Sequence, residues 1–170
     1  MLYIFTGDGK GKTTAAIGSL VRGYGAGKSC AIVFFDKNPD YCNELEVLKK
    51  LGITAHIFGE NRMEKGYFRF TNEERDIGAA KKALNKAYEL ANGQVDILVL
   101  DELLNALRLN QIALNEAVKF IDFFPKNKYL ILTGRGLPEE IKIRAEMISE
   151  VKKIKHPFDN GTSAQKGIDF

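Results

Sequence analysis

The sequence predicts one doubly wound α/β domain with a mostly parallel sheet, and three observations predict it. Short apolar runs alternate with longer amphipathic segments along the 170 residues. The apolar runs show little polar alternation, which is typical of strands covered by helices on both faces. The length suits one domain, since domains usually span about 100–200 residues. We therefore expect residues 1–170 to form a single domain.

The elements follow one another as strand and helix. In chain order, apolar runs predict strands at residues 2–6, 29–35, 54–58, 96–100 and 129–133, with a weaker run at 148–154. Helical character is predicted between them at residues 12–23, 43–51, 72–91, 114–123 and 138–145. The stretch 72–91 has the clearest signal. Thr71 is a candidate N-cap with Glu74 three residues later, which is a capping box. Apolar residues such as Ala80 and Leu84 then recur at helical spacing.

Two segments fit neither pattern. Residues 59–70 contain glycine, with basic residues interleaved with aromatic ones, and residues 155–170 form a tail without a period. Long irregular segments in a compact domain are typically functional or disordered. Ligands of α/β sheets bind at the carboxyl ends of the strands. Because residues 59–70 follow a strand, we expect them to reach that edge.

Composition excludes several classes of protein. The chain is 45% hydrophobic and 28% charged, which is ordinary globular usage and excludes chain-wide disorder. Its longest apolar run, residues 30–35, is far shorter than the roughly 18–20 residues of a membrane span. The net charge of +3 is too balanced to indicate a nucleic-acid partner. Cys30 and Cys42 lack metal-ligand spacing. A strand-like run follows Met1 directly, so we expect no signal peptide. We expect a cytoplasmic protein without a disulfide, a membrane or a nucleic-acid partner.

A glycine-rich stretch between the first strand and the first helix predicts a phosphate site. The residues expected to bind ATP are Gly7, Asp8, Gly9, Lys10, Gly11, Lys12, Thr13 and Thr14. Glycines let backbone N–H groups curve around an anion, and the helix N-terminus adds positive potential. Lys12 can reach phosphate oxygens, and the Thr13 hydroxyl can bind Mg²⁺. Thr6 stands where the standard P-loop has its first glycine. The motif predicts a P-loop NTPase-like, RecA-like three-layer sandwich.

Two carboxylates end the fourth strand. Asp101 is expected to hold Mg²⁺, directly or through water, and Glu102 to act as a second ligand or as a base. An Asp-Glu pair after a strand can also simply begin a helix. Together with the P-loop, the pair indicates a nucleoside triphosphate with Mg²⁺, without indicating the reaction.

An arginine between two glycines ends the fifth strand. Arg135 can contact phosphate through two parallel hydrogen bonds, or it can be a solvated turn residue. No Ser-His-Asp or Cys-His arrangement is visible in the sequence. An enzyme with this chain would work by positioning and charge stabilisation, or with a nucleophile carried by its substrate.

Several blocks together resemble one family, the P-loop type of ATP:corrinoid adenosyltransferase. They are Thr6-Gly7-Asp8-Gly9-Lys10-Gly11-Lys12-Thr13-Thr14-Ala15-Ala16, Leu100-Asp101-Glu102, Leu132-Thr133-Gly134-Arg135-Gly136, and Lys155-His156-Pro157-Phe158 with Gly161 and Ala164-Gln165-Lys166-Gly167-Ile168. Their order and spacing match across nearly the whole chain. The last block is the most specific, because ordinary P-loop proteins lack it. The displaced first glycine of the loop is also this family's form.

The resemblance implies an enzyme of cobalamin (vitamin B12) biosynthesis, a transferase of an alkyl group other than methyl. It would transfer the 5′-deoxyadenosyl group of ATP to the Co(I) of cob(I)alamin or cob(I)yrinic acid a,c-diamide and release triphosphate. Lys12, Glu102 and Arg135 would be its catalytic residues, with Mg²⁺ held by Thr13, Asp101 and Glu102. A flavoprotein electron donor and a homodimer are expected on the same ground.

The resemblance also implies which residues face the corrinoid. Phe68 and Phe70 would exclude its lower axial ligand, although the family often has tryptophan at the position of Phe70. His156 and Gln165 would face the corrinoid from residues 155–170, which would lie near the active site. After the second strand only Lys37 matches the family, so we expect the wall that faces the corrinoid to differ there from the family pattern.

Two rival functions remain open. The chain can be a generic P-loop ATPase or kinase that acts on another small substrate and releases ADP or a phosphorylated product. It can also be a corrinoid- or nucleotide-binding module without catalysis, which would form no Co–C bond.

Overall fold

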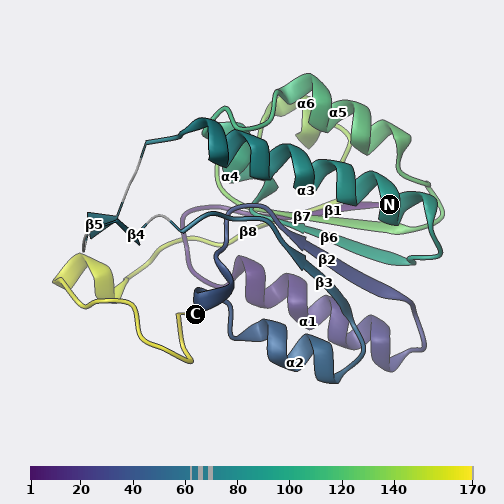
Figure 1. The fold of residues 1–170 in the computed structure, drawn as a ribbon. Helices are drawn as coiled ribbons and strands as arrows, with labels where there is room; N and C mark the ends of the chain where they lie inside the picture. Colours follow the sequence, from purple (N-terminus) through teal and green to yellow (C-terminus); the bar gives the residue numbers. More distant parts are fainter. Residues whose placement is uncertain (62, 65–66, 69–70, 170) are drawn as a thin grey trace.

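A six-stranded sheet forms the centre of the computed structural model, which describes residues 1–61, 63–64, 67–68 and 71–169, with the backbone alone for 63–64 and 67–68 (Figure 1). Its strands are β1 (Leu2–Thr6), β2 (Cys30–Phe34), β3 (Thr54–Ile57), β6 (Ile97–Asp101), β7 (Tyr129–Thr133) and β8 (Met147–Glu150). Their order is β3-β2-β6-β7-β1-β8, and every pairing among them is parallel. The predicted doubly wound α/β fold is confirmed.

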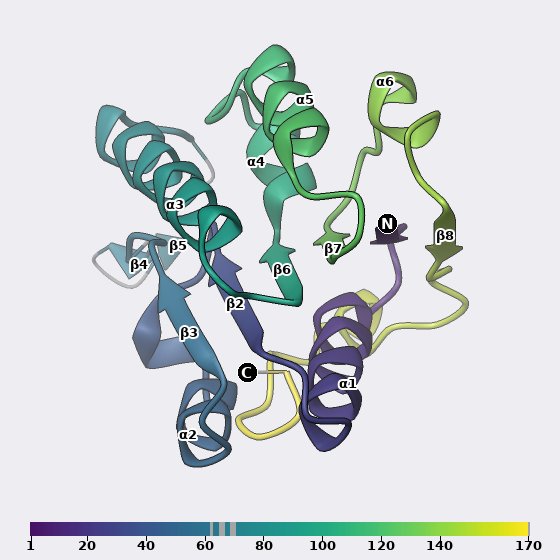
Figure 2. The same ribbon diagram turned by 90° about the vertical axis from the view of Figure 1, so that its right-hand side faces the viewer.

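Helices cover both faces of the sheet, which makes three layers (Figures 1 and 2). One face carries α1 (Lys12–Gly25) and α2 (Glu44–Lys50). The other carries α3 (Glu74–Asn92), α4 (Leu103–Arg108), α5 (Leu114–Phe123) and α6 (Glu139–Lys142). Two short 3₁₀ helices, η1 (Pro39–Tyr41) and η2 (Pro157–Asn160), complete the helical elements among the described residues.

Each face of the sheet has its own apolar core. Ala80, Ala83 and Phe120 pack with the α3–α5 side, whereas Leu20 and Leu48 pack with the α1–α2 side. All five residues of β2 are buried, as expected for a strand covered on both faces. Both cysteines are buried and free, as expected for a chain without a disulfide.

Some element boundaries differ from the sequence-based predictions. The capping box of α3 joins Glu73 and Asp76, not Thr71 and Glu74. The prediction was wrong because Asp76 is buried and accepts a hydrogen bond from the Glu73 N–H at 2.8 Å, so the helix begins at Glu74. Strand β8 ends at Glu150 rather than at residue 154, and α6 is shorter than predicted. Helix α4 was not predicted at all.

The two segments without a sequence pattern lie on the side of the carboxyl ends of the strands (Figure 1). Within residues 59–70, β4 (Met63–Glu64) and β5 (Tyr67–Phe68) form an antiparallel pair. Residues 157–169 are exposed throughout, and η2 is the helical turn among them. In the described part of the chain, no helix combines the length and apolar character that crossing a membrane requires.

Candidate functional site

The sheet topology brings the predicted site residues together. Strands β6, β7 and β1 are adjacent and parallel, so their carboxyl ends meet at one edge. There β1 leads into the glycine-rich loop, β6 ends at Asp101, and β7 ends at Thr133. Distant blocks of the sequence therefore form one site, as expected for ligand sites in α/β sheets.

The glycine-rich loop packs against the chain that follows β8. The Gly9 N–H donates to the Val151 carbonyl oxygen at 2.7 Å. A Cβ atom on Gly7 or Gly9 would lie 2.5 Å or 2.7 Å from that same oxygen. Gly11 adopts a φ of 114° and caps α1, a conformation that favours glycine. Close backbone packing and the left-handed turn are thus the physical reasons for these glycines.

Lys12 lies inside the loop. Its residue is buried, and its Nζ donates to the Gly9 carbonyl oxygen at 2.7 Å. Burial lowers the pKa of Lys12, Arg135 lowers it further, and the negative charge of Glu102 opposes the change. Lys12 therefore places a positive charge at the loop, on the cavity lining and close enough to Glu102 and Asp101 to feel their charges.

Asp101 and Glu102 are joined through Thr133. The Thr133 hydroxyl donates to Asp101 Oδ1 at 2.6 Å and accepts from the Glu102 N–H at 2.9 Å. Asp101 and Thr133 are fully buried. Glu102 has a φ of 63°, uncommon for a residue with a side chain, at the start of α4. Burial, together with the neighbouring charge of Asp101, raises the pKa of Glu102 to about 7.

The two carboxylates fit a divalent cation. Asp101 Oδ2 and Glu102 Oε2 are buried and have no hydrogen-bond partner among the described residues. Buried unpaired carboxylate oxygens are costly unless a cation or a donor satisfies them. Among the described residues no group of three or more His, Cys, Asp or Glu side chains gathers as a metal site. A bound Mg²⁺ would take further ligands from Thr13, phosphate oxygens and water, as it usually does at nucleotide sites.

Arg135 reaches from β7 across to the glycine-rich loop. Its N–H donates to Asn105 Oδ1 at 2.9 Å, and its guanidinium donates to the Asp8 carbonyl oxygen at 3.3 Å. A Cβ on Gly134, whose φ is 133°, would lie 2.8 Å from the Asn105 nitrogen. Arg135 is half exposed. It therefore has room to turn toward a ligand above the loop.

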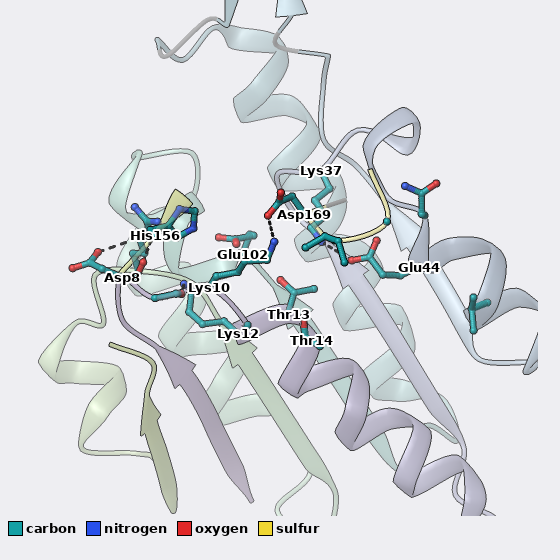
Figure 3. A pocket seen from close by; sticks show the side chains of 17 residues that line it. Asp8, Lys10, Lys12, Thr13, Thr14, Lys37, Glu44, Glu102, His156 and Asp169 are labelled. Carbon is teal, nitrogen blue, oxygen red and sulfur yellow. Dashed lines mark hydrogen bonds and ion pairs between the residues drawn. The ribbon is translucent and has the colours of Figure 1, made fainter. Parts of the chain in front are cut away.

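A cavity of about 610 Å³ opens above the loop (Figure 3). The loop residues from Asp8 to Thr14 line it together with Glu102, Arg135 and His156. Its remaining lining residues come from the segment after β2 and from the end of the chain: Lys37, Asn43, Glu44, Val47, Gly167, Ile168 and Asp169. Asp101 lies buried beneath the lining, and Gly7 lies outside it.

The C-terminal residues meet the loop directly. Lys10 forms an ion pair with Asp169, shown as a dashed line in Figure 3. His156 lines the cavity, and its Nδ1 accepts from the Phe158 N–H at 3.2 Å. Gln165 does not line the cavity. Its Nε2 donates to the Ser163 carbonyl oxygen at 2.9 Å, and its N–H donates to Asp169 Oδ2 at 2.6 Å.

The aromatic pair expected to face a corrinoid is not placed. Phe70 lies outside the described residues, and Phe68 is described only as a backbone position of β5. The sequence analysis also missed one wall of the cavity. Asn43, Glu44 and Val47 carry no motif, and the only signal available was their place after a strand, at the sheet edge where ligands bind.

The whole chain is similar to one family of known proteins. The family model described as ATP:corrinoid adenosyltransferase BtuR/CobO/CobP matches residues 1–170. The corrinoid adenosyltransferase of Escherichia coli (strain K12) is 35% identical over 172 residues, covering 100% of this chain and 85% of that protein. Corrinoid adenosyltransferase CobA of Salmonella typhimurium is 34% identical with the same coverage. The corrinoid adenosyltransferase of a Sinorhizobium species is 34% identical over 174 residues, covering 100% of this chain and 80% of that protein.

The solved structure of C. elegans PCH-2 is a weaker likeness. It has a TM-score of 0.47 and 17% identity, and the alignment covers 88% of this chain and 35% of that chain. That degree of similarity is too low to indicate a shared fold or function.

Proposed function

The chain belongs to the ATP:corrinoid adenosyltransferase family, and on this premise we propose that it transfers the 5′-deoxyadenosyl group of ATP to the Co(I) centre of a reduced corrinoid. The electron pair of Co(I) forms the bond to C5′ while the C5′–O bond breaks. The pair of electrons of that bond leaves with triphosphate, and the cobalt ends formally as Co(III). The atoms and electrons balance without a protein nucleophile.

The observation that supports this proposal most directly is that two cations, Lys12 and Arg135, contact the glycine-rich loop beside the cavity. Lys12 lies within the loop, its Nζ 2.7 Å from the Gly9 carbonyl oxygen, and Arg135 reaches the same loop from β7. Negative charge grows on the triphosphate as the C5′–O bond breaks. Lys12, the loop N–H groups and Arg135 would stabilise that charge more in the transition state than in the ground state.

We propose that Mg²⁺ accompanies ATP in this cavity. Asp101 and Glu102 would hold it through the oxygens that have no hydrogen-bond partner among the described residues, with the Thr13 hydroxyl as a third contact. When bound, the ion would supply Lewis-acid stabilisation of the leaving triphosphate. The Thr133 hydroxyl holds the Asp101 carboxylate by donating to its Oδ1 at 2.6 Å, and it holds the backbone of Glu102 by accepting from the Glu102 N–H at 2.9 Å.

We also propose which corrinoid the chain uses, how its cobalt is reduced, and where and in what oligomeric state the enzyme works. The corrinoid is cob(I)alamin or cob(I)yrinic acid a,c-diamide, a flavoprotein delivers the electron, and the cytoplasmic enzyme is a homodimer of one domain per chain. We propose His156, Phe68, Phe70 and Gln165 as the residues that face the corrinoid. The position of His156 at the cavity lining supports its part of this proposal.

An anaerobic assay tests the proposed reaction. The protein is mixed with MgATP and chemically reduced cob(I)alamin, the visible spectrum is followed, and free triphosphate is measured. We expect a light-sensitive adenosylated corrinoid and triphosphate in equal amounts. Lys12→Ala should lose most of the turnover, because it removes the buried cation of the loop. Accumulation of ADP without a Co–C bond would instead indicate a P-loop ATPase or kinase.

A further inference from the structure

Lys37, which follows β2, lies between two carboxylates at the edge of the cavity. Its Nζ is 3.1 Å from Glu44 Oε1, and Figure 3 shows these two side chains together. The same Nζ is 3.6 Å from Asp101 Oδ2. The ammonium also lies 5.0 Å from the centre of the Phe34 ring. About a fifth of the side chain is exposed, and that part lines the cavity. Lys37 is thus a mostly buried cation in contact with a carboxylate that we propose as a metal ligand.

The charges around Lys37 explain why it remains an ammonium. Burial alone would lower the pKa of Lys37, but Asp101 and Glu44 more than offset this and raise it. Burial alone would raise the pKa of Glu44, but the Lys37 charge and the hydrogen bonds to this carboxylate together lower it. Without Lys37, the nearby carboxylates of Asp101, Glu102 and Glu44 would lose a compensating positive charge, and a buried charge without a partner is costly.

The two distances differ in kind. At 3.1 Å the Lys37–Glu44 contact is a hydrogen-bonded ion pair, whereas 3.6 Å is too long for a hydrogen bond to Asp101 Oδ2. The negative charge of Asp101 is therefore compensated by Lys37, while the buried Oδ2 has no hydrogen-bond partner among the described residues. The Lys37 ammonium would repel a divalent cation bound to Asp101 Oδ2. Lys37 would keep its ion pair with Glu44 with or without the bound cation.

We propose that Lys37 is a positioning residue for Asp101. When no divalent cation is bound, the Lys37 ammonium compensates the charge of Asp101. When a divalent cation binds, Asp101 Oδ2 contacts the cation instead of Lys37. This inference rests on the metal site in the proposed function. It gives Lys37 two effects that separate in experiment: it stabilises the fold in metal-free buffer, and it weakens binding of the bare divalent ion.

The test uses Mn²⁺ as the probe, followed by electron paramagnetic resonance, together with thermal melts of the full chain. In Lys37→Met we expect Mn²⁺ alone to bind about tenfold more tightly, as for the loss of one positive charge a few ångströms from a divalent ion in a solvated site. The melting temperature in metal-free buffer should fall, and saturating Mn²⁺ should restore it. Lys37→Arg should retain wild-type Mn²⁺ affinity.

Lys49→Met is the matched control, because Lys49 is exposed in the last turn of α2 and its loss changes the net charge equally. It should leave both measurements unchanged. If Lys37→Met does not fold, Lys37→Gln replaces it, since its amide can still donate to Glu44. Unchanged or weaker Mn²⁺ binding in the neutral variant would overturn the inference. If the wild type binds no Mn²⁺, or if Asp101→Asn binds it as well as the wild type does, the proposed metal site itself fails.

Discussion

Replacing Thr133 with valine tests whether the Thr133 hydroxyl holds Asp101 and Glu102 in place. Thr133→Val keeps the shape of the side chain and removes the donor to Asp101 Oδ1 and the acceptor of the Glu102 N–H. Both groups would then be buried without a partner at this position. An unsatisfied buried group costs about 1–3 kcal/mol, and more when it is charged, so we expect a loss of about 3–5 kcal/mol in the free energy of unfolding.

That loss corresponds to a fall of about 6–20 °C in melting temperature, at about 2–4 °C per kcal/mol for a domain of this size. Thermal melts measure it in buffer without metal. Mn²⁺ binding, measured by electron paramagnetic resonance, should also weaken in Thr133→Val, because Asp101 is no longer held in place.

Leu132→Ala is the control for lost stability. Leu132 is fully buried one residue before Thr133, and its truncation should cost about 2–5 kcal/mol without touching the polar contacts. We expect it to lower the melting temperature and leave Mn²⁺ affinity unchanged. A fall of less than about 2 °C in Thr133→Val, or an equal loss of Mn²⁺ affinity in Leu132→Ala, would refute the reasoning.

Three further predictions concern the loop, the pH and the tail. Gly9→Ala places a Cβ 2.7 Å from the Val151 carbonyl oxygen and should weaken ATP binding about tenfold by calorimetry, whereas Gly18→Ala, with open space around it, should not. The raised pKa of Glu102, about 7, means that the native site binds an extra proton below that pH, so Mg²⁺ affinity should rise as the pH increases from 6 to 8. Calorimetry in buffers of different ionisation enthalpy should detect proton release, and Glu102→Gln should abolish it. Residues 155–170 should exchange amide hydrogen more slowly with MgATP and corrinoid bound, and equal exchange in both states would contradict this.

Local sequence patterns predicted many of the strands and helices. Strands β1 and β7 and helix α5 have the bounds that the sequence predicted, because a buried apolar run or an amphipathic stretch is defined by neighbouring residues. The glycine-rich loop was also found in sequence, since the loop and its helix are contiguous.

Elements that depend on distant contacts were predicted poorly. Helix α4 is short, and its four buried residues pack into a core that other elements supply. Strand β8 pairs with β1 over four residues, so the partner strand and not the apolar run sets its length. The start of α3 depends on the burial of Asp76, which the sequence does not show.

By itself, the sequence determined the fold class, the glycine-rich loop and the carboxylates at the end of β6, because each is encoded in a short contiguous pattern. The tertiary structure decided which side chains meet. The order of the strands places Thr133 beside Asp101, and Val151 after β8 contacts Gly9. Lys37 lies between Glu44 and Asp101. These contacts connect residues up to about 140 positions apart, and their energies depend on distance and burial in the folded chain, which no local pattern contains.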